Sequence, residues 1–255
     1  MKIGLALSGG GARGIAHIGV LKALDEMNVR IDVIAGTSAG SIVGALYAYG
    51  HKPDQIFEII KTLSIFRSVS FAWTWSGLLT MDGLKELLHK QIPENDFRAL
   101  KIPLTVAATE IRKGHIHYFT EGELIPAVVS SCSIPAMFNP VNFNGGQFVD
   151  GGVLENLPAK PIRDKCDLLI GSHCNHISPE FDAKSLKVVI ERSLLMAIFA
   201  NTLVSRNLCD VFIEPPRMDR FGAFEIGKAQ EIFDYAYRFT KENFMPHHFQ
   251  KIAAA

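Results

Sequence analysis

Two glycine-rich turns, each between an apolar run and a stretch of helical apolar spacing, constrain the fold most. The first, SGGGARG at residues 8–14, follows the mainly apolar run Lys2–Leu7. The second, GTSAG at residues 36–40, follows Val29–Ala35 and precedes Ala39–Tyr49. A short buried strand, a tight turn and a helix, repeated in this way, are typical of an α/β fold with parallel strands. We therefore expect both turns at the carboxyl edge of one sheet.

The rest of the chain continues this alternation. Asn144-Gly145, inside the alternating segment Val141–Val149, predicts a β-hairpin. Further strands are expected at Ile102–Thr109, His115–Phe119, Asp167–Ser172 and Asp210–Pro215, and helices from Pro53, over Leu186–Asn207 and over Gly227–Phe244. This pattern predicts a three-layer α/β/α fold with a mainly parallel central sheet. Because no linker or low-complexity tract interrupts the sequence, we expect a single domain over residues 1–255.

Composition argues against several functional classes. Acidic and basic residues number 26 each, and the basic residues are dispersed, so no nucleic acid partner is expected. The cysteines have no CxxC spacing and are predicted to be reduced structural thiols: Cys132, Cys166, Cys174 and Cys209. No metal site is expected from them.

The apolar segments bear on location. The amino terminus has too short an apolar run for a secretory signal, so the cytoplasm is the default expectation. Val33–Gly50 carries no charge and approaches the length of a membrane span. However, Arg30 and Asp32 lie next to it, and an all-apolar helix also suits the interior of a covered sheet, so we favour a buried segment.

The loop SGGGARG has two competing interpretations. Gly9, Gly11 and Gly14 have the spacing of a dinucleotide-binding fingerprint. That site needs an acidic residue at the far end of the second strand, whereas Asp32 falls near its start. Consecutive glycines also expose backbone N–H groups, which can hold a phosphate or the oxyanion of a tetrahedral acyl intermediate. A plain packing role for these glycines stays open.

Ser38, at the centre of GTSAG, is a candidate nucleophile. Gly-x-Ser-x-Gly between a strand and a helix is the pattern of a nucleophile elbow, although a tight glycine turn would read the same way. A serine hydroxyl needs a base. His173 would complete a serine–acid–histidine order with Asp150. Alternatively, Asp150, held at a strand end before Gly151-Gly152, could accept the proton directly.

Four blocks together resemble the patatin-like phospholipase family, particularly its small bacterial members. They are GGGARG at 9–14, GTSAG at 36–40, SSCSIPAMFNPV at 130–141 and DGG at 150–152. The resemblance implies an α/β/α fold and a lipid acyl hydrolase that needs no histidine, metal or cofactor. Past Gly152 it extends to general pattern only.

The resemblance also implies roles for individual residues. Ser38 is the implied nucleophile and Asp150 its catalytic acid partner. The N–H groups of Gly10 and Gly11, with Gly9 as a further donor, would form the oxyanion hole. Arg13 would steady the loop or meet a phosphate head group.

Several functional points stay open at this level. The substrate could be a phospholipid, a lysophospholipid or a neutral ester, and an acyltransferase would use the same acyl-enzyme. A nucleotide-binding protein and a catalytically silent interaction protein are the alternatives from other classes. The aromatic segment FAWTWSGLLT at residues 71–80 suits either a lid at a membrane interface or core. Peripheral membrane contact and the oligomeric state are left open.

Overall fold

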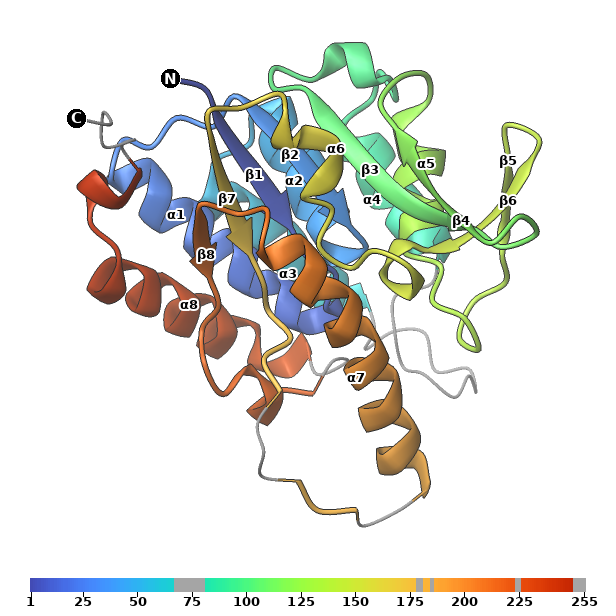
Figure 1. The fold of residues 1–255 in the computed structure, drawn as a ribbon. Coiled ribbons are helices and arrows are strands. Elements are labelled where there is room, and N and C mark those ends of the chain that lie inside the picture. Colours follow the sequence, from blue (N-terminus) through green and yellow to red (C-terminus); the bar gives the residue numbers. More distant parts are fainter. Residues whose placement is uncertain (67–80, 178–180, 184–185, 223–225, 250–255) are drawn as a thin grey trace.

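The computed structural model describes residues 1–66, 81–177, 181–183, 186–222 and 226–249. Within these residues an eight-stranded sheet runs in the order β5-β6-β3-β2-β1-β7-β8, with β4 paired to β3 (Figure 1). The strands are β1 (Ile3–Leu7), β2 (Val33–Thr37), β3 (Leu104–Glu110), β4 (His115–Phe119), β5 (Val141–Phe143), β6 (Gly146–Asp150), β7 (Leu168–Ser172) and β8 (Val211–Ile213). The pairs among β3, β2, β1, β7 and β8 are parallel, whereas β4, β5 and β6 pair antiparallel. The expected α/β fold with a mainly parallel sheet is confirmed.

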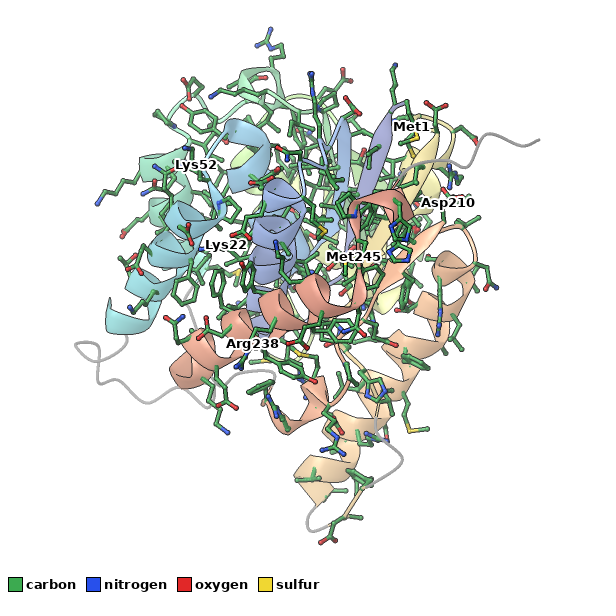
Figure 2. All side chains as sticks on the ribbon, turned by 90° about the vertical axis from the view of Figure 1, so that its left-hand side faces the viewer. Met1, Lys22, Lys52, Asp210, Arg238 and Met245 are labelled. Atoms are coloured by element: carbon green, nitrogen blue, oxygen red, sulfur yellow. The ribbon has the colours of Figure 1, made fainter. Side chains whose placement is uncertain are left out.

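Helices cover both faces of the sheet. They are α1 (Ile15–Glu26), α2 (Ala39–Tyr49), α3 (Pro53–Phe66), α4 (Met81–Gln91), α5 (Leu124–Ser131), α6 (Lys160–Arg163), α7 (Leu186–Arg206) and α8 (Ala229–Asn243). Figure 2 looks onto the side where α8 packs against α1. On the opposite face α6 contacts β1 and β2.

The alternation of side chains along β1 explains the two cores. Leu5 and Leu7 point into the large core, to which α1, α2, α5 and α8 contribute. Ala6, between them, belongs to a smaller core that includes Ile162 of α6. Because successive strand residues face opposite sides, a strand that is apolar throughout is buried by both layers.

Strand β3 brings the ends of β2 and β6 together. β4 occupies one edge of the carboxyl half of β3, so β2 and β6 share the other edge. On that edge Thr37 of β2 lies opposite Ala107, and Asp150 of β6 lies opposite the next residue, Ala108. The two strands run in opposite directions and end head to head. The residue after Thr37 therefore meets the end of β6.

Two expectations about the first half of the chain need revision. The strand expected from Val29 begins at Val33, because the Val29 N–H donates to the Leu24 carbonyl (3.0 Å) in the turn that closes α1. The short helix α5 was not expected from the apolar pattern. The charge-free run Val33–Gly50 forms β2 and α2 inside the protein.

The hairpin at residues 141–150 follows the Asn-Gly signal. Asn144 and Gly145 both have positive φ, 46° and 74°, which is the conformation of a tight hairpin turn. Its second strand ends at Asp150. The aromatic segment at residues 71–80 lies outside the described residues.

The close contact between α1 and α8 depends on Gly19. A Cβ at Gly19 would lie 2.8 Å from the backbone nitrogen of Tyr237, closer than real Cβ contacts allow. We expect Gly19→Ala to lower the free energy of unfolding by about 1–3 kcal/mol, because α8 must move away from α1. Urea unfolding measures this change.

Gly227→Ala is the matched control, since nothing lies within 4 Å of a Cβ built there. Both substitutions reduce the entropy of the unfolded chain alike, so their difference reports native packing. Equal stability of the two variants would contradict the close packing of α8 on α1.

Candidate active site

Ser38 lies at a strained turn between β2 and α2. Its backbone has φ 51° and ψ −124°, a conformation that costs a non-glycine residue roughly 1–3 kcal/mol. The flanking glycines are required by close backbone contacts. A Cβ at Gly36 would lie 2.6 Å from the Gly40 carbonyl oxygen, and one at Gly40 would lie 2.6 Å from the Ser8 carbonyl oxygen. This is the backbone geometry of a nucleophile elbow.

Neighbouring hydroxyl groups hold this turn. The Ser38 N–H donates to Ser131 Oγ at 2.8 Å, and the Ser131 hydroxyl donates to the Ala107 carbonyl at 2.6 Å. On the other side, the Ser41 hydroxyl donates to the Ser38 carbonyl at 2.6 Å. These bonds tie the elbow to α5 and β3. Sequence reasoning did not find them, although Ser131 lies in a block quoted for the family resemblance.

The Asp150 carboxylate lies beside the Ser38 side chain. Asp150 Oδ1 accepts the Gly152 N–H at 2.7 Å, and the neighbouring Ser38 hydroxyl favours the ionised form of the carboxyl group. The Asp150 N–H donates to the Ser133 carbonyl at 2.9 Å, which fixes the end of β6. Asp150 is 7% exposed, and this burial raises the pKa of its carboxyl group to about 6. The structure therefore places a buried carboxylate of raised basicity beside a serine hydroxyl.

Cys132 is a second potential nucleophile close to Ser38. Its thiol contacts the Ser38 and Ser41 side chains. Burial raises the pKa of the Cys132 thiol far above its usual range. Because the thiolate is the reactive form, this raised pKa argues against Cys132 as the nucleophile.

The glycine loop lies against the same turn. A Cβ at Gly9 would lie 2.7 Å from Asn156 Oδ1 and 3.1 Å from Ser38 Cβ, so the loop packs tightly against this turn. Within the described part of the chain, no acceptor takes the N–H groups of Gly10 and Gly11, and Gly11 has φ 57°. Two amides near Ser38 are therefore available to an anion.

Gly9 differs from the expectation for this loop. Its N–H donates to the Asn156 carbonyl at 3.0 Å, so it is not available to an oxyanion. Its carbonyl accepts the Asn175 side-chain amide at 2.7 Å. Gly9 thus anchors the loop between two asparagines, and the amides available to an oxyanion are those of Gly10 and Gly11 rather than the expected three.

Arg13 supports the loop from behind. Its side chain is 5% exposed, and its Nε donates to the Phe221 carbonyl at 2.7 Å. The guanidinium is thus held inside the protein by a backbone carbonyl of the segment that follows β8. This contact favours the loop-supporting role over contact with a phosphate head group.

His17 of α1 fixes the start of the loop. Its Nε2 donates to the Ser8 carbonyl at 2.8 Å, because a carbonyl oxygen can only accept. Its Nδ1 then accepts the Ser172 hydroxyl at 2.8 Å. Burial lowers the pKa of His17 to about 4, so the ring is neutral near pH 7. No sequence signal distinguished this histidine from the others.

His173 is engaged elsewhere. Its Nδ1 bonds Glu214 Oε1 at 2.7 Å, and its ring stacks on Phe212 with centroids 6.0 Å apart. Within the described residues, the hydrogen bond and ring contacts of the His173 side chain are with residues other than Ser38 and Asp150. The described residues do not assemble a serine–aspartate–histidine triad around it.

Two asparagines brace the turn that follows Asp150. Asn201 of α7 accepts the Asn156 N–H at 3.0 Å and donates from Nδ2 to the Gly152 carbonyl at 3.1 Å. Asn156 in turn holds Gly9. A single amide side chain on α7 therefore links the acid turn to the segment that positions the glycine loop. The sequence contains no pattern that predicts this link.

The structure also bears on dinucleotide binding. Asp32 accepts the Ile3 N–H at 2.8 Å, at the amino ends of β1 and β2. The glycine loop lies at their carboxyl ends, so Asp32 is at the wrong edge to hold a ribose. Among the described residues, no group of three or more His, Cys, Asp or Glu residues could hold a metal ion.

Comparison with known proteins agrees with the resemblance drawn from the motifs. The family profile described as patatin-like phospholipase matches residues 5–162. An uncharacterized NTE family protein of Mycobacterium tuberculosis is 34% identical over 178 residues, covering 68% of this chain and 49% of that protein. A lysophospholipase NTE1 of Candida glabrata is 35% identical over 167 residues, covering 63% of this chain and 10% of that protein.

A solved structure agrees with the fold. VipD from Legionella pneumophila matches with a TM-score of 0.52 at 16% identity, over 91% of this chain and 66% of that one. The chain spans about half the length of the mycobacterial relative. The family profile covers more than half of the chain and contains Ser38, Asp150 and the glycine loop. The chain belongs to the patatin-like phospholipase family.

Proposed function

We propose that this protein is a serine acyl hydrolase that cleaves carboxylic esters of lipids through a Ser38–Asp150 dyad. The observation that carries the proposal is the placement of the Ser38 side chain beside the buried Asp150 carboxylate, at the point where β2 and β6 end head to head. Two unpaired amides of the glycine loop lie beside it. A nucleophile, a base and an anion site at one strand edge are the parts that acyl transfer needs.

The first half of the reaction forms an acyl-enzyme. Asp150 accepts the Ser38 proton as Oγ bonds to the ester carbonyl carbon, and the carbonyl oxygen becomes an oxyanion. The N–H groups of Gly10 and Gly11 hold this oxyanion; removing one such donor typically costs about a hundredfold or more in turnover. When the intermediate collapses, the alcohol leaves and takes the proton from Asp150.

The second half releases the acid. A water molecule loses a proton to Asp150 and attacks the acyl carbon, and the proton then returns to Ser38 as the fatty acid leaves. The amino terminus of α2, directly after Ser38, adds a partial positive charge that favours the oxyanion.

The pKa of Asp150 suits a base. Burial raises this pKa to about 6, so the carboxylate is still ionised near pH 7 yet more basic than an exposed aspartate. The lysophospholipase relatives favour a phospholipid or lysophospholipid as substrate.

Active-site labelling tests the proposed nucleophile. We expect a fluorophosphonate probe to label the wild type and not Ser38→Ala, because labelling requires an activated serine. Intact mass spectrometry measures labelling. A Ser38→Ala variant that still takes the probe would refute the assignment.

The proposed base is tested by Asp150→Asn. This substitution should lower ester hydrolysis by at least about a hundredfold, since the base is lost. Asp82→Asn is its control, since Asp82 lies on α4 with its side chain 87% exposed.

The pH profile of the wild type should have an acidic limb. Hydrolysis is expected to fall as the pH drops through about 6, because protonated Asp150 cannot accept the Ser38 proton. Initial rates on a water-soluble short-chain ester measure the profile between pH 4 and 8. A rate that stays constant down to about pH 4 would show that the base has an ordinary carboxyl pKa.

The raised pKa also predicts a stability gain on removing the charge. Folded Asp150 keeps its proton up to about pH 6 and unfolded Asp150 only to about 3.8, so its burial costs stability as pH rises through this window. Asp150→Asn should therefore be more stable than wild type at pH 8 by about 1–3 kcal/mol. The gain should fade toward pH 4. Urea unfolding at both pH values tests this, and a gain independent of pH would contradict it.

Replacement of His173 separates the dyad from a triad. His173→Gln is expected to keep turnover within about fivefold of wild type, because the ring bonds Glu214 and not the dyad. Titration with the fluorophosphonate gives the concentration of intact active sites, and turnover is expressed per intact site to correct for any loss of folded enzyme. If turnover per site fell about a thousandfold, His173 and not Asp150 would be the base.

A further inference from the structure

Helix α7 turns one aliphatic face outward. At about 100° per residue, one arc of about 140° carries only apolar or small uncharged residues. All of them are exposed: Leu186, Val189, Ile190, Ser193, Met196, Ala197, Ala200, Leu203 and Val204. We call this surface the outer arc of α7. Leu186 and Val204 are 75% and 71% exposed.

Three uncharged polar side chains of α7, Asn201, Thr202 and Ser205, face the protein. Thr202 and Ser205 are 1% and 4% exposed, and Asn201 bonds the catalytic turn. A surface helix of a soluble domain normally has the reverse arrangement, with its apolar stripe inward. An outward apolar arc marks a contact with another apolar phase or partner.

The composition of α7 resembles that of membrane-associated helices. Among the described residues, Val188–Arg206 is the one stretch long and apolar enough to cross a bilayer, and only 12% of it is buried. Its inner side is bonded to the protein through Asn201, so α7 is not free to insert across a membrane. This combination suits a helix that lies in the interface.

The position of α7 relates the outer arc to the candidate site. Its amino-terminal half projects beyond the carboxyl edge of the sheet, the edge that carries Ser38 (Figure 1). Its carboxyl-terminal half contacts the turn after Asp150 through the Asn201–Gly152 bond. The outer arc and the proposed dyad therefore belong to one continuous end of the molecule.

We propose that the outer arc of α7 docks the protein on a lipid surface, in the boundary between head groups and acyl chains. The inference rests on the proposed function, because an ester substrate held in a bilayer must reach a buried dyad. The arc carries no charge, and the chain has 26 basic and 26 acidic residues. Docking therefore depends on apolar burial, and zwitterionic lipid suffices.

Co-sedimentation with phosphatidylcholine vesicles tests the proposal on the full chain. The test variant is the double substitution Met196→Asp with Val204→Asp. The wild type should sediment equally well at low and high salt, because apolar burial is not screened. The double variant should bind at least about tenfold more weakly, since two apolar side chains lose their burial.

Met245→Asp is the matched control. Met245 is 49% exposed and Met196 55%, but Met245 follows α8 and is not part of the outer arc. It should bind within about twofold of wild type, and thermal unfolding checks that all variants fold. A wild type that stays in the supernatant, or a double variant that binds like wild type, would overturn the proposal. A wild-type dimer that the double variant dissociates would assign the arc to a second copy instead.

A separate variant distinguishes docking from catalysis. Ser38→Ala should sediment with vesicles like wild type although it hydrolyses no ester. Vesicle binding without Ser38-dependent hydrolysis would refute the proposed function and leave docking intact. Hydrolysis of a soluble ester without vesicle binding would refute docking alone.

Discussion

The proximity of the Ser38 side chain to the Asp150 carboxylate is the constraint on which the rest of the proposed site depends. It arises because β2 and β6 end head to head along one edge of β3, opposite the neighbouring residues Ala107 and Ala108. A purely parallel sheet would bring no antiparallel strand to this edge. The mixed topology around β3 is therefore what allows an aspartate to reach the serine without an intervening histidine.

This arrangement is costly, and the surrounding structure offsets the cost. Ser38 has a strained backbone, and Asp150 is an almost fully buried carboxylate whose pKa burial raises to about 6. The Ser38 N–H donates to Ser131 Oγ and the Gly152 N–H donates to Asp150 Oδ1, and these bonds help to fix both groups. Since buried charges are tolerated only when they are hydrogen-bonded, these bonds offset part of the cost of burying Asp150. Under the proposed function, the raised pKa gives the site a base near neutral pH in exchange for this loss of stability.

Short sequence motifs predicted much of this site, whereas the contacts between residues distant in sequence could not be predicted. The Gly-x-Ser-x-Gly turn, the Asn144-Gly145 hairpin and the strand–helix alternation are short-range patterns, so one sequence predicts them. The Gly9 N–H contact with Asn156 and the brace from Asn201 join residues distant in sequence, and no periodicity reports them. The apolar pattern of α7 was visible as a helix, but only the fold reveals that its aliphatic side faces outward.

The titration of Asp150 itself tests the account most directly. Carbon-13 NMR of the labelled carboxyl group should give a pKa near 6 in the wild type. Because the neighbouring Ser38 hydroxyl favours the ionised form of Asp150, the pKa should rise further in Ser38→Ala. An Asp150 pKa near that of an exposed aspartate, and unchanged on removing the hydroxyl, would contradict the direct pairing of these two side chains.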